Sequence, residues 1–216
     1  MSETSSAFAA GDEITRKSFA IIRARLGAFD APADIMELVV RVAHTTGDVA
    51  FATTFVFSPL AVEAGIEALA AGRPVVTDVG MVRTGIRARE LAKIGSACHC
   101  LLDEEATLAL AAGEGLTRSA AAIRRAAAQG TLDGAIVAIG NAPTALFELM
   151  DLFAAGAAKP ALVIGVPVGF VGALESKTAL AGTAIRHITN LSERGGSPIA
   201  AALVNGLVAL ALGRKA

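Results

Sequence analysis

The sequence predicts a single-domain, three-layer α/β/α fold with a mainly parallel sheet over residues 1–216. From residue 75 onward, short apolar runs alternate with longer helix-like segments, and parallel strands need such crossover helices. These runs are apolar at consecutive positions, as in strands that are covered on both faces. No repeat or linker divides the chain, and its length suits one domain.

The chain is expected to begin with a mobile tail at residues 1–11 and a helix at 14–26. Asp34 is expected to cap a second helix, which ends at Gly47. The apolar residues of this second helix recur at the spacing of one buried face, and they are Ile35, Leu38, Val39 and Val42.

The later elements are predicted from their residue types and from the glycines and prolines at their ends. Segments rich in β-branched and apolar residues are expected to be extended, and they are 49–57, 75–79, 97–102, 135–139 and 161–166. Segments with helical patterns or helix-starting prolines are expected to be helical, and they are 59–71, 88–93, 104–112, 118–129, 144–155, a helix through 175–177, and 199–212.

Charge and hydropathy exclude several classes of function. The formal net charge is -1 without a block of like charges, so neither nucleic acid nor an anionic membrane is expected as a partner. The longest uncharged runs, 160–174 and 197–213, contain prolines and polar or glycine positions, so no membrane span is expected. The N-terminus lacks the cationic and apolar regions of a signal peptide, which predicts a cytoplasmic protein.

Two cysteines flank a histidine, and this pattern invites a metal site. In an alternating strand, however, Cys98 and Cys100 lie on one face and His99 on the other. No second ligand pair completes a zinc site, so we expect no metal and two reduced thiols.

The helix at 199–212 is apolar nearly all round, which favours burial against a second subunit.

Glycine-rich segments follow several of the predicted strands. The carboxyl ends of parallel strands line one crevice in this fold class, and ligands bind there. Glycine lets backbone amides approach a ligand, and helix N-termini direct N–H groups at anionic oxygens. Ordinary turn and cap chemistry explains each segment alone, but together they predict a site for several carboxylates or phosphates. The segments are 78–85, 140–144, 167–172 and 194–198.

His44 is the candidate for proton transfer. Arg41 precedes it by one turn and places a permanent cation beside a group that titrates near neutral pH. Asp48 could accept a proton from the second imidazole nitrogen and fix the ring. A structural role for a histidine near a helix end is the alternative. The chain has no P-loop, dinucleotide fingerprint or nucleophile elbow, so these patterns favour cofactor-free proton transfer on a polyanionic organic substrate.

Several motifs, in order, resemble the precorrin-8X methylmutase family of cobalamin biosynthesis. They are Ser18–Arg23, Arg41–Asp48, Asp78–Val82, Gly140–Leu146, Pro167–Ala173 with Glu175–Lys177, and Arg194–Ser197. The resemblance covers residues 14–212. It departs from the family pattern at Glu193 and Arg25, and the absence of tyrosine means that no role of an aromatic hydroxyl transfers.

The resemblance implies an isomerase that moves a methyl group from C-11 to C-12 of precorrin-8X or cobalt-precorrin-8, giving hydrogenobyrinate or cobyrinate. It implies His44 as the general acid/base, no cofactor, and a homodimer with active sites near the subunit interface. The positions expected to contact the tetrapyrrole are Ser18, Arg41, Thr45, Asp78, Met81, Val82, Gly140, Asn141, Ala142, Gly169, Phe170, Gly195, Gly196 and Ser197. A non-catalytic tetrapyrrole carrier and a different acid/base isomerase on the same fold are the alternatives.

Overall fold

The computed structural model describes residues 3–214, and the side chains of residues 11–214. Within this part, the chain forms one sheet of six strands. Their spatial order is β1 (Phe55–Phe57), β6 (His187–Asn190), β5 (Leu162–Gly165), β4 (Ile136–Ile139), β2 (Val75–Thr77) and β3 (Cys98–His99). The edge strand β1 pairs antiparallel with β6, and the other pairs are parallel, which confirms the expected mainly parallel sheet.

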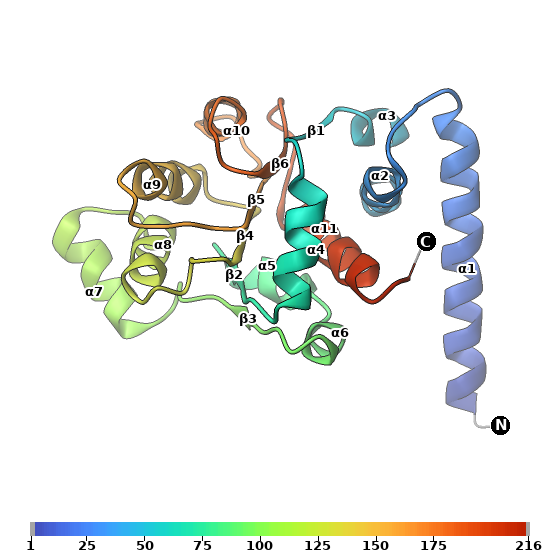
Figure 1. The fold of residues 1–216 in the computed structure, drawn as a ribbon, viewed down its shortest axis with the longest axis horizontal. Helices are drawn as coiled ribbons and strands as arrows, with labels where there is room; N and C mark the ends of the chain where they lie inside the picture. Colours follow the sequence, from blue (N-terminus) through green and yellow to red (C-terminus); the bar gives the residue numbers. More distant parts are fainter. Residues whose placement is uncertain (1–2, 215–216) are drawn as a thin grey trace.

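Helices cover both faces of the sheet (Figure 1). Alternate strand residues enter opposite cores, because successive side chains of a strand point to opposite faces. Ile136 and Ala138 join one core, whereas Val137 and Ile139 join the other. This arrangement confirms the three-layer α/β/α fold.

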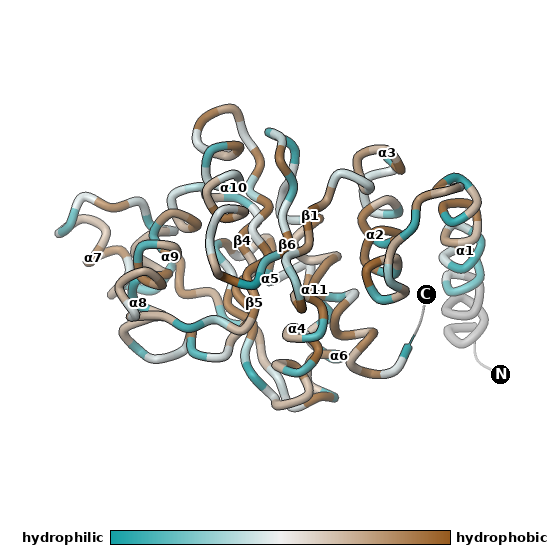
Figure 2. Tube along the Cα trace, turned by 45° about the horizontal axis from the view of Figure 1, so that its top comes forward, coloured by the Kyte–Doolittle hydropathy of each residue, from teal (hydrophilic) through white to brown (hydrophobic). Residues whose placement is uncertain are grey.

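The two outer layers differ in which helices supply them. The first core contains residues of α2 (Ala33–Thr46), α3 (Val49–Ala52), α4 (Ala61–Ala70), α5 (Gly80–Gly85), α6 (Ala88–Lys93) and α11 (Ser197–Ala211). The second core contains residues of α8 (Arg118–Ala128), α9 (Pro143–Ala154) and α10 (Ala173–Ala181), and α7 (Glu105–Glu114) packs on α8. Hydrophobic segments gather along the strands and α11, as Figure 2 shows.

The first helix, α1 (Glu3–Leu26), stands outside the three layers and packs on α2 and α3 (Figure 1). Among its described side chains, it buries Phe19, Ile22 and Leu26, and Arg23 forms an ion pair with Glu37 of α2. The helix begins at Glu3, so it includes most of the segment that we expected to be a tail. Met1 and Ser2 lie outside the described residues.

The segment at residues 49–57 is only partly extended, which corrects the sequence prediction. The Asp48 carboxylate accepts the Phe51 N–H at 2.8 Å, and this cap starts the short helix α3 before β1. Asp34 does not cap α2: the cap position is Pro32, and the Asp34 carboxylate accepts the neighbouring Ile35 N–H.

Two further elements differ from expectation. Residues 80–85 form α5 where we expected a loop, and the central strand β6 was not predicted. In β6, His187, Thr189 and Asn190 are polar, so the run lacks the apolar composition of the other central strands. Their polar groups are satisfied inside the protein; for example, the Thr189 hydroxyl donates to the Gly165 carbonyl at 2.6 Å.

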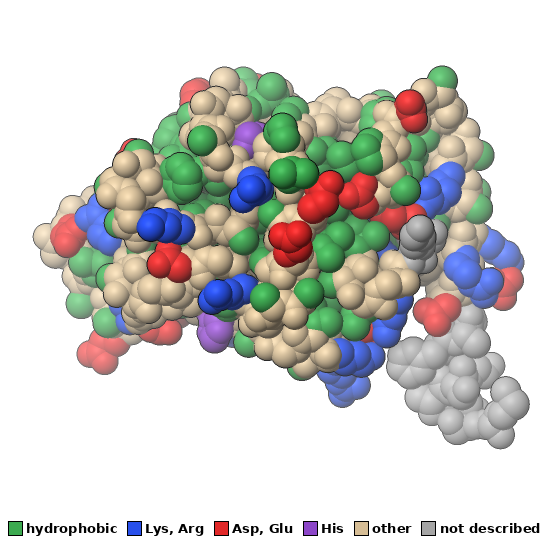
Figure 3. All heavy atoms as spheres, in the orientation of Figure 1, with side chains coloured by type: hydrophobic (Ala, Val, Ile, Leu, Met, Phe, Trp, Pro, Cys, Tyr) green, Lys and Arg blue, Asp and Glu red, His purple; other side chains and the backbone are tan. Residues whose placement is uncertain are grey.

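Charged side chains are unevenly distributed over the surface. On the face seen in Figure 3, basic side chains form small scattered groups, and acidic side chains gather over the α4 region. Between residues 3 and 214, no helix combines the length and the apolar character that crossing a membrane requires.

Candidate active site

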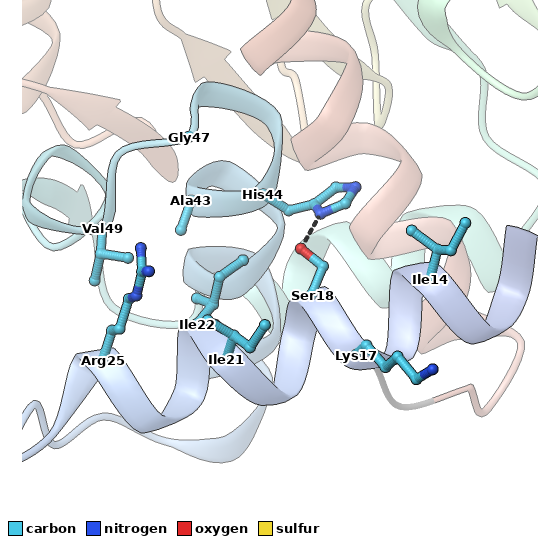
Figure 4. Close-up of a pocket in the computed structure, with 10 residues that line it drawn as sticks. All are labelled: Ile14, Lys17, Ser18, Ile21, Ile22, Arg25, Ala43, His44, Gly47 and Val49. Carbon is cyan, nitrogen blue, oxygen red and sulfur yellow. Dashed lines mark hydrogen bonds between the residues drawn. The ribbon is translucent and has the colours of Figure 1, made fainter.

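His44 lies in the last turn of α2, where it meets α1. The helix ends at Thr46 because Gly47 adopts the left-handed conformation, with a φ of 67°, and its N–H donates to the Ala43 carbonyl. The Ser18 hydroxyl of α1 lies 2.8 Å from Nδ1 of His44 (Figure 4). This bond orients the ring, so that Nε2 is the nitrogen left to meet a ligand.

Phe19 also packs against the imidazole of His44. Its ring meets His44 edge-on, with centroids 5.2 Å apart and an interplanar angle of 86°. The Arg41 guanidinium lies 5.5 Å from the centroid of the same Phe19 ring. Arg41 and His44 therefore share one aromatic neighbour, and the neighbouring Thr45 is exposed at the same helix end.

Arg41 is a partly buried cation in the same helix. Its Nε is buried, and among the described residues this atom has no hydrogen-bond partner. Burial, followed by the like charge of Arg87, lowers the pKa of Arg41 from its ordinary value, while the Glu37 carboxylate opposes this effect. The side chain thus keeps the capacity to bind an anion.

A pocket of about 370 Å³ opens beside His44 between α1 and the α2–α3 corner. Its walls include the exposed apolar side chains of Ile14 and Ile21, and the Arg25 side chain reaches toward Val49 (Figure 4). An imidazole, apolar walls and a cation at the edge are suited to an apolar ring system that carries acidic arms.

Asp48 does not contact His44, which corrects the expected pairing. One of its oxygens caps α3 through the Phe51 N–H, and the other lies 2.9 Å from Arg194 Nη2. These hydrogen bonds, the Phe51 amide first and Arg194 second, lower the pKa of Asp48. The partner of the imidazole is Ser18 instead.

The glycine-rich segments do gather at the carboxyl edge of the sheet, as expected from the fold class. Gly140 packs against Ser197 so closely that a Cβ would lie 2.8 Å from the Ser197 Cα and 2.9 Å from Val82. In the same way, a Cβ at Gly195 would lie 2.7 Å from the Pro167 carbonyl oxygen. The segments around residues 80, 140, 168 and 196 therefore form one cluster.

Asp78 has a different role from the one expected. Its fully buried carboxylate accepts the backbone N–H groups of Gly140, Asn141 and Ala142 at 3.1, 2.8 and 2.8 Å. Burial raises the pKa of Asp78, and the amide donors oppose that rise. Asp78 thus positions the loop, and these three amides are already used inside the protein rather than being free for a ligand.

Two more of the loop amides are also used internally. The Gly169 N–H donates to the Glu193 carbonyl at 3.0 Å, and the Gly196 N–H donates to the Val166 carbonyl at 2.8 Å. Two apolar side chains of this cluster are exposed instead: Phe170 is 93% exposed and Met81 is 70% exposed. Val82, which we expected to contact the substrate, is fully buried in the first core. The cluster therefore offers an apolar rim more than a ring of amide donors.

The described pocket beside His44 is lined by none of these loop residues. Arg194 connects the glycine-rich cluster with the α2–α3 corner beside the pocket. Its guanidinium carbon lies 3.9 Å from the Phe51 ring centroid, and its Nη2 binds Asp48. We did not predict this contact, although Arg194 directly precedes the glycine pair that we singled out.

The cysteines do not form a metal site. Burial raises the pKa of the Cys98 thiol to about 12, so this thiol is protonated at neutral pH and is a poor ligand. Across the part of the chain that the structure describes, no cluster of histidine, cysteine and carboxylate side chains could hold a metal ion.

The chain is similar to known proteins along almost its whole length. The family model for precorrin-8X methylmutase matches residues 13–210. Precorrin-8X methylmutase of Pseudomonas aeruginosa is 45% identical over 199 residues, which cover 91% of this chain and 94% of that protein. Cobalt-precorrin-8 methylmutase of Methanocaldococcus jannaschii is 39% identical over 181 residues, covering 84% and 82% of the two chains.

A solved structure agrees with these sequence comparisons. The crystal structure of precorrin-8X methyl mutase from Thermus thermophilus superimposes with a TM-score of 0.86 at 36% identity, covering 93% of this chain and 98% of that one. The chain belongs to the precorrin-8X methylmutase family, and it is an isomerase of cobalamin biosynthesis.

Proposed function

We propose that this isomerase moves a methyl group from C-11 to C-12 of precorrin-8X or cobalt-precorrin-8, with His44 as its general acid/base. The observation that carries the proposal is the exposed imidazole of His44, which Ser18 orients from one side and which borders an apolar pocket. An imidazole that borders a pocket can act as a general acid/base toward a bound substrate.

His44 acts in its protonated form. Its Nδ1–H donates to the Ser18 hydroxyl, and its Nε2–H donates to a nitrogen of the macrocycle. Protonation polarises the conjugated system toward the methyl shift, and the proton returns to the imidazole afterwards. The reaction is intramolecular and needs no co-reactant. Acid catalysis of this kind contributes about 10²- to 10⁴-fold.

Arg41 supports recognition of the acidic arms of the substrate. Arg41 does not line the pocket and its Nε is buried, but the residue is only partly buried and its guanidinium shares the Phe19 ring with His44. A substrate carboxylate would pair with the accessible part of this cation. Lys17 and Arg25 add two cationic side chains to the lining of the pocket.

The active enzyme is a homodimer in this proposal. The pocket has a volume of about 370 Å³, which is small for a tetrapyrrole with its acidic arms, and exposed Ile14 and Ile21 leave its wall apolar and open. Phe170 and Met81 are exposed as well. A second copy of the chain would cover such apolar surface and enlarge the site.

We place the enzyme in the cytoplasm, where the unpaired thiols of Cys98 and Cys100 would stay reduced.

The test compares wild type with His44→Ala on metal-free and cobalt-containing substrate. We expect His44→Ala to bind the tetrapyrrole but to lose about 10²- to 10⁴-fold in kcat. His99→Ala is the control, because His99 is exposed on the edge strand β3. A change of absorption without a change of mass, over many turnovers, identifies an isomerase; a spectral change that stops at one equivalent identifies a carrier and contradicts the proposal.

A further inference from the structure

Lys177 is a buried cation near the carboxyl edge of the sheet. It lies in α10 with a side chain that is fully buried, and its Nζ donates to the Arg194 carbonyl at 2.6 Å and to the Asn190 side-chain oxygen at 3.4 Å. Asn190, which ends β6 and is also buried, donates from Nδ2 to the Arg194 carbonyl at 3.0 Å. Two buried side chains therefore hold one backbone carbonyl.

Burying Lys177 in the core costs free energy. An ammonium group loses its hydration on burial, and neither acceptor here is a carboxylate. Burial lowers the pKa of Lys177 to about 8, although the exposed Glu193 acts in the opposite direction. An apolar side chain of similar length would fill the space without this cost, so stability alone does not explain the lysine.

The carbonyl that Lys177 holds belongs to the residue that contacts the His44 region. The Arg194 side chain leaves the turn, stacks on Phe51 and binds the Asp48 carboxylate at 2.9 Å. Asp48 starts α3 directly after the end of α2, and the flanking Gly47 and Val49 line the pocket beside His44 (Figure 4).

We propose that Lys177 is a positioning residue for the isomerisation: by holding the Arg194 carbonyl it fixes the Arg194–Asp48 ion pair, and thereby the α2–α3 corner that forms part of the His44 pocket. The inference rests on the proposed function of His44. An exposed ion pair by itself contributes little energy, so its value here lies in geometry, where a shift of about 1 Å can cost about 10²-fold in rate.

Other hydrogen bonds also hold the turn at residues 193–196. Loss of the Lys177 amine should therefore shift this turn without unfolding the protein. The Gly196 N–H binds the Val166 carbonyl, and the Glu193 carbonyl accepts the Gly169 N–H, on either side of Arg194. Loss of the Lys177 amine therefore leaves the turn attached at its flanks, while the carbonyl between them keeps Asn190 as its donor.

The experiment is a double-mutant cycle with Lys177→Met and Arg194→Ala, measured as steady-state kinetics of the full chain. We expect each single variant to lose roughly 10- to 100-fold in kcat with little change in KM, and the double variant to lose no more than either single variant. Lys159→Met is the matched control, because Lys159 is exposed at the opposite edge of the sheet, next to the Asp133 loop. If the losses in kcat of the two single variants added up in the double variant, Lys177 would not act through Arg194 and the inference would be wrong.

Hydrogen exchange provides a readout that does not need the chemistry of His44. The Phe51 amide, which Asp48 caps, should exchange faster in both single variants than in wild type. If His44→Ala turned over normally while this exchange still increased, the proposed function would fail and the positional link would stand. Should Lys177→Met not fold, the exposed Arg194→Ala decides: unchanged kcat and unchanged Phe51 exchange overturn the inference.

Discussion

The Ser18 hydroxyl on α1 lies 2.8 Å from Nδ1 of His44 on α2. This contact joins the helix outside the three layers to the helix that carries the proposed proton donor. Phe19, Ile22 and the Arg23–Glu37 ion pair seat α1 on α2, so the hydroxyl reaches the ring from a fixed place. The orientation of the imidazole therefore depends on the seating of α1.

Ser18→Ala should lower kcat by roughly tenfold while KM changes little, because the ring keeps its place but loses the group that fixes its rotation. Steady-state kinetics measure this. Thr15→Ala removes an exposed hydroxyl bond on the same helix, from Thr15 to the Gly11 carbonyl, and serves as the control. Equal kcat for Ser18→Ala and wild type would contradict a role of Ser18 in orienting His44.

The sequence predicted the architecture because parallel strands and crossover helices leave local patterns. The apolar runs at residues 135–139 and 161–166 became the buried strands β4 and β5. The same rule missed β6, because its polar residues obtain their partners only in the folded chain: the Thr189 hydroxyl binds Gly165, and Nδ1 of His187 lies 2.8 Å from the Ile185 carbonyl.

Less of the candidate site than of the fold could be predicted from the sequence. Ser18 and His44 are 26 residues apart on different helices, so no spacing rule joins them, and only the family resemblance placed both in the site. Asp48 is close enough in sequence to pair with His44, but the same carboxylate can also start a helix, and the chain uses it for that. Burial of Asp78, which decides its role, depends on elements that lie far away in sequence.

Asp78→Asn should destabilise the fold by about 1–3 kcal/mol, because an amide NH₂ replaces an acceptor oxygen and leaves a buried backbone N–H without a partner. Urea unfolding measures the effect. Asp133→Asn is the control, since the exposed Asp133 accepts the Lys159 N–H through one oxygen, which asparagine can also do. If both variants unfolded at the same urea concentration, the loop would not depend on the Asp78 carboxylate.

Gly195→Ala should destabilise the protein by about 1–3 kcal/mol and lower kcat, because the added methyl group overlaps the Val166 and Pro167 carbonyl oxygens and displaces the turn. Gly113→Ala is the matched control within α7. Apart from the neighbouring residues and backbone of α7 itself, no described atom lies within 4 Å of a Cβ placed there, so alanine should be neutral or stabilising by up to about 1 kcal/mol. Thermal unfolding and kinetics distinguish the pair, and a Gly195→Ala variant with wild-type values would refute the close packing of the turn.

Stability should respond to pH through Lys177. Its pKa is 10.5 in the unfolded chain and about 8 in the folded protein. Between these values the unfolded chain binds more protons, so stability rises with pH, and the cost of burying the ammonium is largest below about pH 8.

Lys177→Met removes this dependence, so the difference in unfolding free energy between wild type and the variant isolates it from other titrating groups. We expect this difference to shift by about 2 kcal/mol in favour of wild type between about pH 7 and about pH 9.5. Urea unfolding at both pH values measures the shift. A difference that stays constant would mean that the amine does not change its charge on folding in this range, and that the carbonyl of Arg194 is held by an ammonium throughout.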